Sequence, residues 1–207
     1  MKAVRIKIYE ENPNPKAIDK AVEILRKGGL IIYPTDTIYG LGCDITNPKA
    51  MERLARIKGV KVHQYNWSFV CADLSNLSDY TRHIDTPSFK ILKKALPGPY
   101  TFVLNGNNRL PREFKKRKTV GIRVPDHNTA RTLVRELGHP IVSTSIKDED
   151  EVIEYTTDPD LIYEKWQHLV DAVIDGGYGG NIPSTVVDLT GDVPEVIRAG
   201  KGNDDIW

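Results

Sequence analysis

Apolar residues recur along the chain with two different spacings, and segments of each kind follow one another. Between residues 15 and 29, the apolar positions Ile18, Val22 and Leu25 repeat with helical spacing, after a proline and before a Gly-Gly pair. This pattern predicts a helix with a defined start and stop. The short apolar run at 30–33 follows directly and predicts a strand that leads into a polar turn.

The same alternation continues to the end of the chain. The patterns predict further helices at 48–57, 88–96, 128–137 and 159–170, and further strands in the opening segment and at 67–71, 100–104, 119–124, 141–145, 172–175, 185–189 and 194–198. Interleaved helices and strands are typical of an α/β or mixed α+β fold. Because the connection between 104 and 119 has no helix, some strands must pair antiparallel. We therefore expect one domain built on a twisted mixed sheet flanked by helices.

Bulk composition fits a globular protein and restricts its possible partners. The chain has 207 residues, 40% hydrophobic and 28% charged, with a net charge of +1. Any affinity for nucleic acid must therefore come from charge gathered on one face. Charges interrupt the short apolar stretch at the start, and no run approaches the ~18 apolar residues of a membrane span. Cys43 and Cys71 are too few for a disulfide framework, and the five histidines lack zinc-like spacing, so we expect a reduced cytoplasmic protein without a side-chain metal site.

Candidate chemistry begins with clusters of small hydroxyl residues where strands end. Such clusters stand at 33–37, 142–145 and 183–185, and the first contains Asp36, which could orient a hydroxyl or an amine. In α/β sheets, ligands bind beyond strand ends, and backbone N–H groups with Ser and Thr hydroxyls can hold phosphate. Each cluster alone is equally compatible with helix caps and turns.

Three cations accompany these clusters. Lys58 follows a predicted helix, where it could reach a phosphate or simply complement the helix dipole. Arg123 alternates with apolar neighbours inside a predicted strand, which suits a bidentate grip on a carboxylate or phosphate, with a structural salt bridge as the alternative. Arg198 stands at a strand end before a glycine-rich segment.

A basic run occupies residues 109–118. Its cations include Arg112, Lys115, Lys116, Arg117 and Lys118. A run of this kind is usually a solvated surface, but its place between two strands near Arg123 makes it a candidate contact for RNA phosphates. The acidic segment 148–154 balances it, so charge is segregated along the chain.

Taken together, the ordered motifs resemble the YrdC/YciO family, and most closely its YciO branch. The matching segments are 28–42, 97–104, 119–125, 174–177, 184–190 and 197–198. The resemblance covers a domain at 14–202, preceded by a strand and turn at 1–13 and followed by a tail at 203–207.

The resemblance implies a YrdC/RibB-like fold with a concave basic cavity and binding of tRNA or double-stranded RNA. The synthases of the family make threonylcarbamoyl-AMP from threonine, bicarbonate and ATP, with Mg²⁺, for tRNA t6A modification. Carried over by position, the resemblance assigns threonine binding to Thr35, Arg123 and Ser184, and nucleotide binding to Lys58, Thr119, Ser143, Ser145 and Arg198.

Two positions depart from the synthase pattern. Val60 stands where the synthases carry Arg, and Lys147 stands where they carry Asn. Losing a charge-assisted hydrogen bond at each place would cost about 1.5–3 kcal/mol. Three hypotheses therefore remain: a slow synthase, a non-catalytic module that binds tRNA, double-stranded RNA or the ribosome, and an enzyme that acts on another carbamoylatable substrate.

Overall fold

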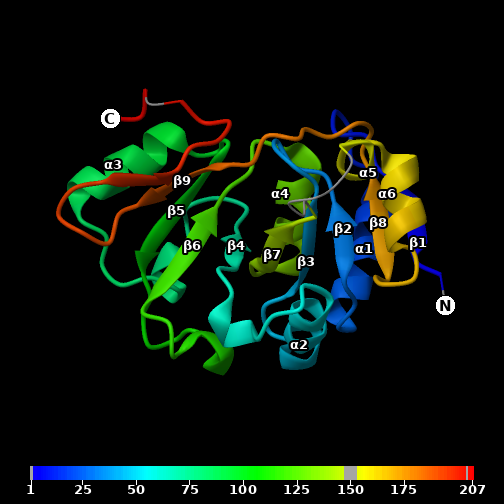
Figure 1. The fold of residues 1–207 in the computed structure, drawn as a ribbon, viewed down its shortest axis with the longest axis horizontal. Helices are drawn as coiled ribbons and strands as arrows, with labels where there is room; N and C mark the ends of the chain where they lie inside the picture. Colours follow the sequence, from blue (N-terminus) through cyan, green and yellow to red (C-terminus); the bar gives the residue numbers. More distant parts are fainter. Residues whose placement is uncertain (1, 147–152, 204) are drawn as a thin grey trace.

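A single ten-stranded sheet organises the computed structural model, which describes residues 2–146, 153–203 and 205–207. The strands are β1 (Val4–Lys7), β2 (Ile31–Tyr33), β3 (Gly40–Asp44), β4 (Ser68–Val70), β5 (Tyr100–Asn105), β6 (Thr119–Arg123), β7 (Ile141–Ser145), β8 (Ala172–Asp175), β9 (Thr185–Asp188) and β10 (Glu195–Arg198). Their order across the sheet is β1-β8-β2-β3-β7-β4-β6-β5-β9-β10, which can be followed from right to left in Figure 1 as far as β5.

Parallel and antiparallel pairs are both present. The pairs β1–β8, β2–β8, β4–β6 and β5–β9 are parallel, and β2–β3, β3–β7, β4–β7, β5–β6 and β9–β10 are antiparallel. The mixed sheet predicted from the sequence is therefore confirmed, as is antiparallel pairing across the 104–119 connection.

Strand β3 was not predicted, because two of its five residues are glycines, which weaken a strand pattern. Packing explains why they are there. A Cβ atom on Gly40 would lie 2.8 Å from the ring of Tyr33, and one on Gly42 would lie 2.5 Å from Cγ2 of Ile141. Bulkier residues are excluded where β3 passes between its neighbours.

The helices are α1 (Pro15–Arg26), α2 (Pro48–Ile57), α3 (Thr86–Ala95), α4 (Asn128–Leu137), α5 (Glu154–Thr157) and α6 (Pro159–Trp166), with short 3₁₀ turns η1 (Val62–Gln64), η2 (Leu77–Asp79) and η3 (Arg112–Phe114). Side-chain caps define several starts: Asn14, Asn47 and Asp85 accept hydrogen bonds from the first turns of α1, α2 and α3. The Asp85 cap moves the start of α3 two residues before its predicted position. Helix α6 ends at Trp166, four residues before the predicted end.

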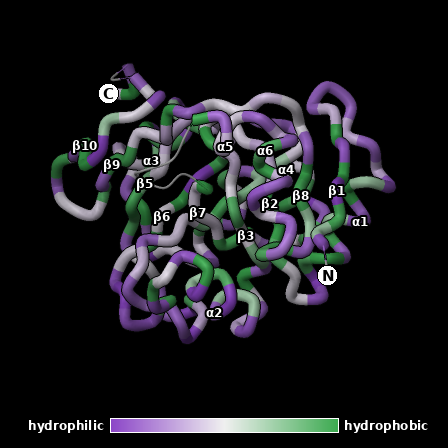
Figure 2. Tube along the Cα trace, turned by 45° about the vertical axis from the view of Figure 1, so that its right-hand side comes forward, coloured by the Kyte–Doolittle hydropathy of each residue, from purple (hydrophilic) through white to green (hydrophobic). Residues whose placement is uncertain are grey.

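The sheet separates two apolar clusters. Helices α1 and α4 pack on one face against Ile31, Tyr33 and Ile141, and α2 and α6 pack on the other face with Ile32 and Val142. Successive residues of β2 thus enter opposite clusters, as the period of a strand requires. Hydrophobic stretches accordingly run through the inner strands in Figure 2, and hydrophilic ones gather in the outer loops. Within the described part of the chain, no helix has the length and apolar character to cross a membrane.

Candidate active site

A cavity of about 550 Å³ opens over strands β4, β5, β6, β7 and β9. Strand β6 supplies part of its floor. Thr119, Val120, Gly121 and Arg123 line the cavity, whereas Ile122 is fully buried. At Gly121 the floor has no side chain, and a Cβ atom there would lie only 3.3 Å from Cγ2 of Thr101.

Hydroxyl groups share the floor and walls with apolar side chains. The hydroxyls belong to Thr37, Tyr65, Ser68, Thr101, Thr119, Ser143, Thr144, Ser145 and Ser184. The three hydroxyl clusters of the sequence, far apart along the chain, thus meet in one cavity, because β3, β7 and β9 bring their ends to it.

Three of these hydroxyls are held by hydrogen bonds to buried neighbours. The Thr101 and Ser184 hydroxyls lie 2.9 Å apart. The Tyr33 hydroxyl donates to Ser143 Oγ at 2.7 Å, and Ser143 donates in turn to the Leu41 carbonyl at 3.2 Å. Burial raises the pKa of Tyr33 to about 12, so its phenol remains a donor. The Ser143 hydroxyl is therefore held in one orientation in the floor of the cavity and does not rotate freely.

Arg123 is anchored through one of its nitrogens. Nη2 donates to Thr35 Oγ1 at 3.1 Å, to Asp36 Oδ1 at 2.6 Å and to Thr37 Oγ1 at 2.5 Å. Both members of the ion pair are nearly buried, with 12% of the Arg123 side chain and 8% of the Asp36 side chain exposed. The salt-bridge alternative for Arg123 thus describes the structure, although its guanidinium also lines the cavity.

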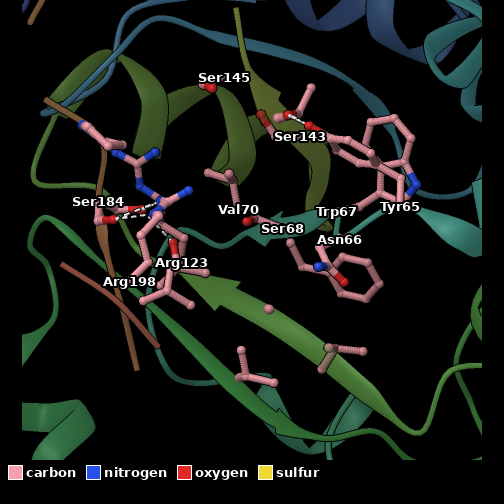
Figure 3. A pocket seen from close by; sticks show the side chains of 18 of the residues that line it. Tyr65, Asn66, Trp67, Ser68, Val70, Arg123, Ser143, Ser145, Ser184 and Arg198 are labelled. Carbon is pink, nitrogen blue, oxygen red and sulfur yellow. Dashed lines mark hydrogen bonds between the residues drawn. The ribbon is translucent and has the colours of Figure 1, made fainter. Parts of the chain in front are cut away.

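Arg198 reaches the cavity from β10. Its Nη2 donates to the Ser184 carbonyl at 2.8 Å and to Ser184 Oγ at 3.2 Å. Burial, followed by the positive charge of Arg123, lowers the pKa of Arg198 below its ordinary value. The charged form is therefore under electrostatic stress that an anionic ligand would relieve. Arg123, Arg198 and Ser184 lie together at one end of the cavity in Figure 3.

Aromatic residues form the opposite end (Figure 3). The rings of Tyr65 and Trp67 pack at 4.4 Å between centroids, and the Tyr65 hydroxyl lies 3.0 Å from Thr144 Oγ1. Arg117 fixes this rim by donating to the Tyr65 carbonyl and, at 2.7 Å, to Asn66 Oδ1. Burial lowers the pKa of Arg117 from its ordinary value. One member of the basic run therefore lines the cavity instead of the open surface.

Other residues singled out from the sequence lie elsewhere. Thr35 is buried behind Arg123 and lines a second cavity of about 460 Å³ on the far side of the 34–37 turn. Lys58 caps the end of α2 and is not among the residues lining the main cavity. Val60 packs against the apolar cluster beneath the sheet. Lys147 and most of the acidic segment fall outside the described residues.

The remaining cations of the basic run stay on the surface. Arg112, Lys115, Lys116 and Lys118 are exposed, on and after η3. They flank Phe114 and Arg117, which line the cavity, so this exposed group adjoins its mouth.

Sequence reasoning missed much of the lining, above all Ser68, Val70, Thr101 and Val103. In β5 their signal was alternation, since Thr101 and Val103 line the cavity, whereas all three residues of β4 line it. Without knowing that this half of the sheet holds a cavity, the same alternation indicates only a half-buried strand.

The electrostatic character of the cavity is one-sided. Among the described residues, its lining includes three arginines and neither Asp nor Glu. Asp36 forms an ion pair with Arg123 from behind, whereas Arg117 and Arg198 donate to neutral oxygens within the described part of the chain. In the same described part of the chain, no group of three or more His, Cys, Asp or Glu residues could hold a metal ion. Such a cavity suits an anionic ligand of nucleotide size.

Comparison with known protein families identifies relatives of this chain. The family model for Sua5, YciO and YrdC, described as "Telomere recombination", matches residues 23–200. The chain belongs to the Sua5/YciO/YrdC family. The resemblance expected from the motifs is thereby confirmed.

Within the Sua5/YciO/YrdC family, the chain is similar to both YciO proteins and synthases. It is 44% identical to "Uncharacterized protein YciO" of Escherichia coli K12 over 199 residues, 95% of each chain. It is 30% identical to the threonylcarbamoyl-AMP synthase of Bacillus subtilis over 200 residues, which cover 92% of this chain but 55% of the synthase.

Two solved structures of the family agree with the fold. The crystal structure of E. coli YciO matches with a TM-score of 0.89 and 42% identity, covering 99% of this chain and 98% of YciO. The crystal structure of P. abyssi Sua5 complexed with L-threonine matches with a TM-score of 0.85 and 28% identity, covering 96% of this chain and 58% of Sua5.

Proposed function

We propose that this chain binds ATP and L-threonine in the main cavity and makes threonylcarbamoyl-AMP slowly from threonine, bicarbonate and ATP. The observation that carries the proposal is the cavity itself, with three arginines, many hydroxyls and no acidic side chain among its described lining residues. Support comes from relatives named threonylcarbamoyl-AMP synthase and from the Sua5 structure that holds L-threonine.

The proposed reaction needs positioning more than proton transfer. Threonine and bicarbonate condense to an N-carboxylated amino acid with loss of water. A carboxylate oxygen of that adduct attacks the α-phosphorus of ATP, the bond to the bridging oxygen of the β-phosphate breaks, and pyrophosphate leaves. In this proposal Arg198 stabilises negative charge that develops on the phosphates, and the fixed hydroxyls of Thr101 and Ser184 orient the reacting groups.

Magnesium would enter as part of the ATP complex. The described cavity residues offer hydroxyls and guanidinium groups, which suit phosphate oxygens better than a bare divalent cation. The phosphates would therefore hold the ion, and the protein would hold the phosphates.

Val60 is the structural reason to expect a slow reaction. The resemblance places an arginine of the synthases at this position, whereas Val60 packs into the apolar cluster and presents no charge to a phosphate. The loss of one charge-assisted hydrogen bond, about 1.5–3 kcal/mol, corresponds to a rate lower by roughly 10- to 150-fold if the contact forms in the transition state.

The test is pyrophosphate release by the purified protein with ATP, bicarbonate and Mg²⁺, with and without L-threonine. We expect slow release that requires threonine, that is lost in Arg198→Met and that persists in Arg135→Met, an exposed arginine on α4. Isotope from labelled threonine should appear in an adenylate. No threonine-dependent product at high enzyme concentration would sink the proposal.

A second candidate function, RNA binding, rests on the exposed cations Arg112, Lys115, Lys116 and Lys118 beside the cavity mouth. Their position would let tRNA or double-stranded RNA lie across the entrance through phosphate contacts. Such binding weakens steeply with salt.

Reversing three lysines of this surface to glutamate (Lys115, Lys116 and Lys118) should abolish RNA binding in a filter or fluorescence assay. The matched control reverses three exposed lysines elsewhere: Lys16, Lys20 and Lys49. Equal RNA affinity for both triple variants would exclude this surface as the binding face.

A further inference from the structure

Asp36 forms the wall between the two cavities and is fixed from three directions. Its Oδ1 accepts from Arg123 at 2.6 Å, its Oδ2 accepts from the Asp126 backbone N–H at 3.0 Å, and its carbonyl accepts from Lys201 Nζ at 2.5 Å. The side chain lines the second cavity, whereas Arg123 lines the main one. An acidic residue thus lies directly behind Arg123, the arginine that the family resemblance assigns to threonine.

The geometry of the guanidinium makes this contact consequential. A guanidinium grips a carboxylate bidentately through either Nε with Nη2 or Nη1 with Nη2, so both forks need Nη2. In Arg123, the two Nη2 hydrogens already face three acceptors, on Thr35, Asp36 and Thr37. Nε is buried and has no hydrogen-bond partner among the residues that the structure describes. A substrate carboxylate therefore meets an arginine whose bidentate faces are both occupied.

We propose that Asp36 is an internal competitor for Arg123 and sets how tightly the site holds a substrate carboxylate. This inference rests on the proposed function, because it takes the threonine carboxylate as the ligand of Arg123. While Asp36 accepts a hydrogen bond from Nη2, the substrate carboxylate can form only single hydrogen bonds with Arg123. When Asp36 rotates away, the substrate carboxylate can bind the guanidinium bidentately.

The second cavity has room for the Asp36 side chain to rotate away from Arg123, at an electrostatic cost. Its about 460 Å³ already adjoin the Asp36 side chain, so rotation needs no rearrangement of the core. Glu10 and Asp126 also line it, and their like charge opposes the move, while Lys201 partly offsets them. The repulsion from Glu10 and Asp126 therefore favours the Asp36–Arg123 ion pair in the free protein. Only a carboxylate ligand that makes further contacts in the cavity can displace Asp36 from Arg123. Small carboxylates without such contacts should bind weakly.

The experiment compares L-threonine with L-threoninol, which lacks the carboxylate, by calorimetric titration of wild type and Asp36→Asn. Asparagine keeps the size and one hydrogen-bond acceptor but removes the competing charge. We expect threonine to bind about tenfold more tightly to Asp36→Asn, equivalent to about 1.4 kcal/mol, and threoninol to bind the two proteins equally.

Asp126→Asn is the charge-matched control. It removes one negative charge from the same cavity wall but leaves the backbone N–H that holds Asp36, so the ratio of threonine to threoninol affinity should stay within about twofold of wild type. An unchanged or weaker threonine affinity in Asp36→Asn, including no binding at all, would overturn the inference, as would an equal gain for threoninol.

The two proposals fail separately. Absence of a threonine-dependent product from wild type would remove the synthase function while leaving tighter threonine binding to Asp36→Asn intact. Conversely, an active wild type whose Asp36→Asn variant shows no gain for threonine would leave the synthase and remove the competitor.

Discussion

Replacing Arg198 with methionine removes one cation of the cavity while keeping most of the side-chain length. Two opposing effects set the magnitude. Losing a charge-assisted hydrogen bond to a ligand phosphate costs about 1.5–3 kcal/mol. Arg123 remains in the cavity lining and still attracts the phosphates, which offsets part of that cost. We therefore expect ATP to bind about 1.5–2 kcal/mol more weakly, roughly 10- to 30-fold in Kd.

Calorimetric titration with Mg-ATP at two salt concentrations measures the effect. The difference between wild type and variant should shrink as salt rises, because part of the lost term is electrostatic. The Ser184 carbonyl loses its donor, so thermal unfolding must first show that the variant is folded. Arg135→Met serves as control and should bind ATP like wild type. An ATP Kd within twofold of wild type in Arg198→Met would refute the assignment of phosphate to this end of the cavity.

Three further predictions concern the frame around the site. Tyr33→Phe should lower the free energy of unfolding by about 1 kcal/mol in urea denaturation, because the buried hydrogen bond to Ser143 is lost; an unchanged value would contradict the fixed floor. Gly40→Ala should cost about 1–3 kcal/mol in the same assay, since its Cβ would lie 2.8 Å from the Tyr33 ring, and a neutral result would mean that the ring moves freely. Burial lowers the pKa of His127, so the unfolded chain takes up the proton first as pH falls through about 6.5 and stability should drop there. His127→Gln should remove this part of the pH dependence and the exposed His168→Gln should not, whereas equal slopes would argue against a buried neutral imidazole.

The sequence predicted elements best where periodicity and local caps agree. Helix α4 has the expected bounds, because its apolar face ends at Gly138, whose φ of +91° favours glycine. Strand β3 was not predicted, because its glycines are required by close contacts with Tyr33 and Ile141, which belong to other strands. The hydrophobic periodicity of a short segment does not show that a residue must be small because of side chains that are distant in the sequence.

For the site, the residue types were predictable and their pairing was not. Strand-end hydroxyls and Arg123 stand out in the sequence, and the fold brings Thr37, Ser143 and Ser184 into one cavity. The Asp36–Arg123 pair depends on how the 34–37 turn meets β6, residues 87 positions apart. Whether these residues bind threonine and ATP remains a prediction that the experiments above address.

The order of strands in the sheet bears on when this protein can function during its synthesis. Strand β1 pairs with β8, β5 pairs with β9, and the Lys201–Asp36 hydrogen bond joins residues 165 positions apart. A chain emerging from the ribosome therefore makes the turn at 34–37 long before β9 and β10 can close the cavity over it. Such long-range pairing slows folding. Until β8 is made, β1 lacks the strand with which it pairs, and β2 is paired only with β3. A ligand stabilises only the form that binds it. If the finished cavity binds ATP as proposed, nucleotide should protect the finished protein from unfolding without helping the nascent chain.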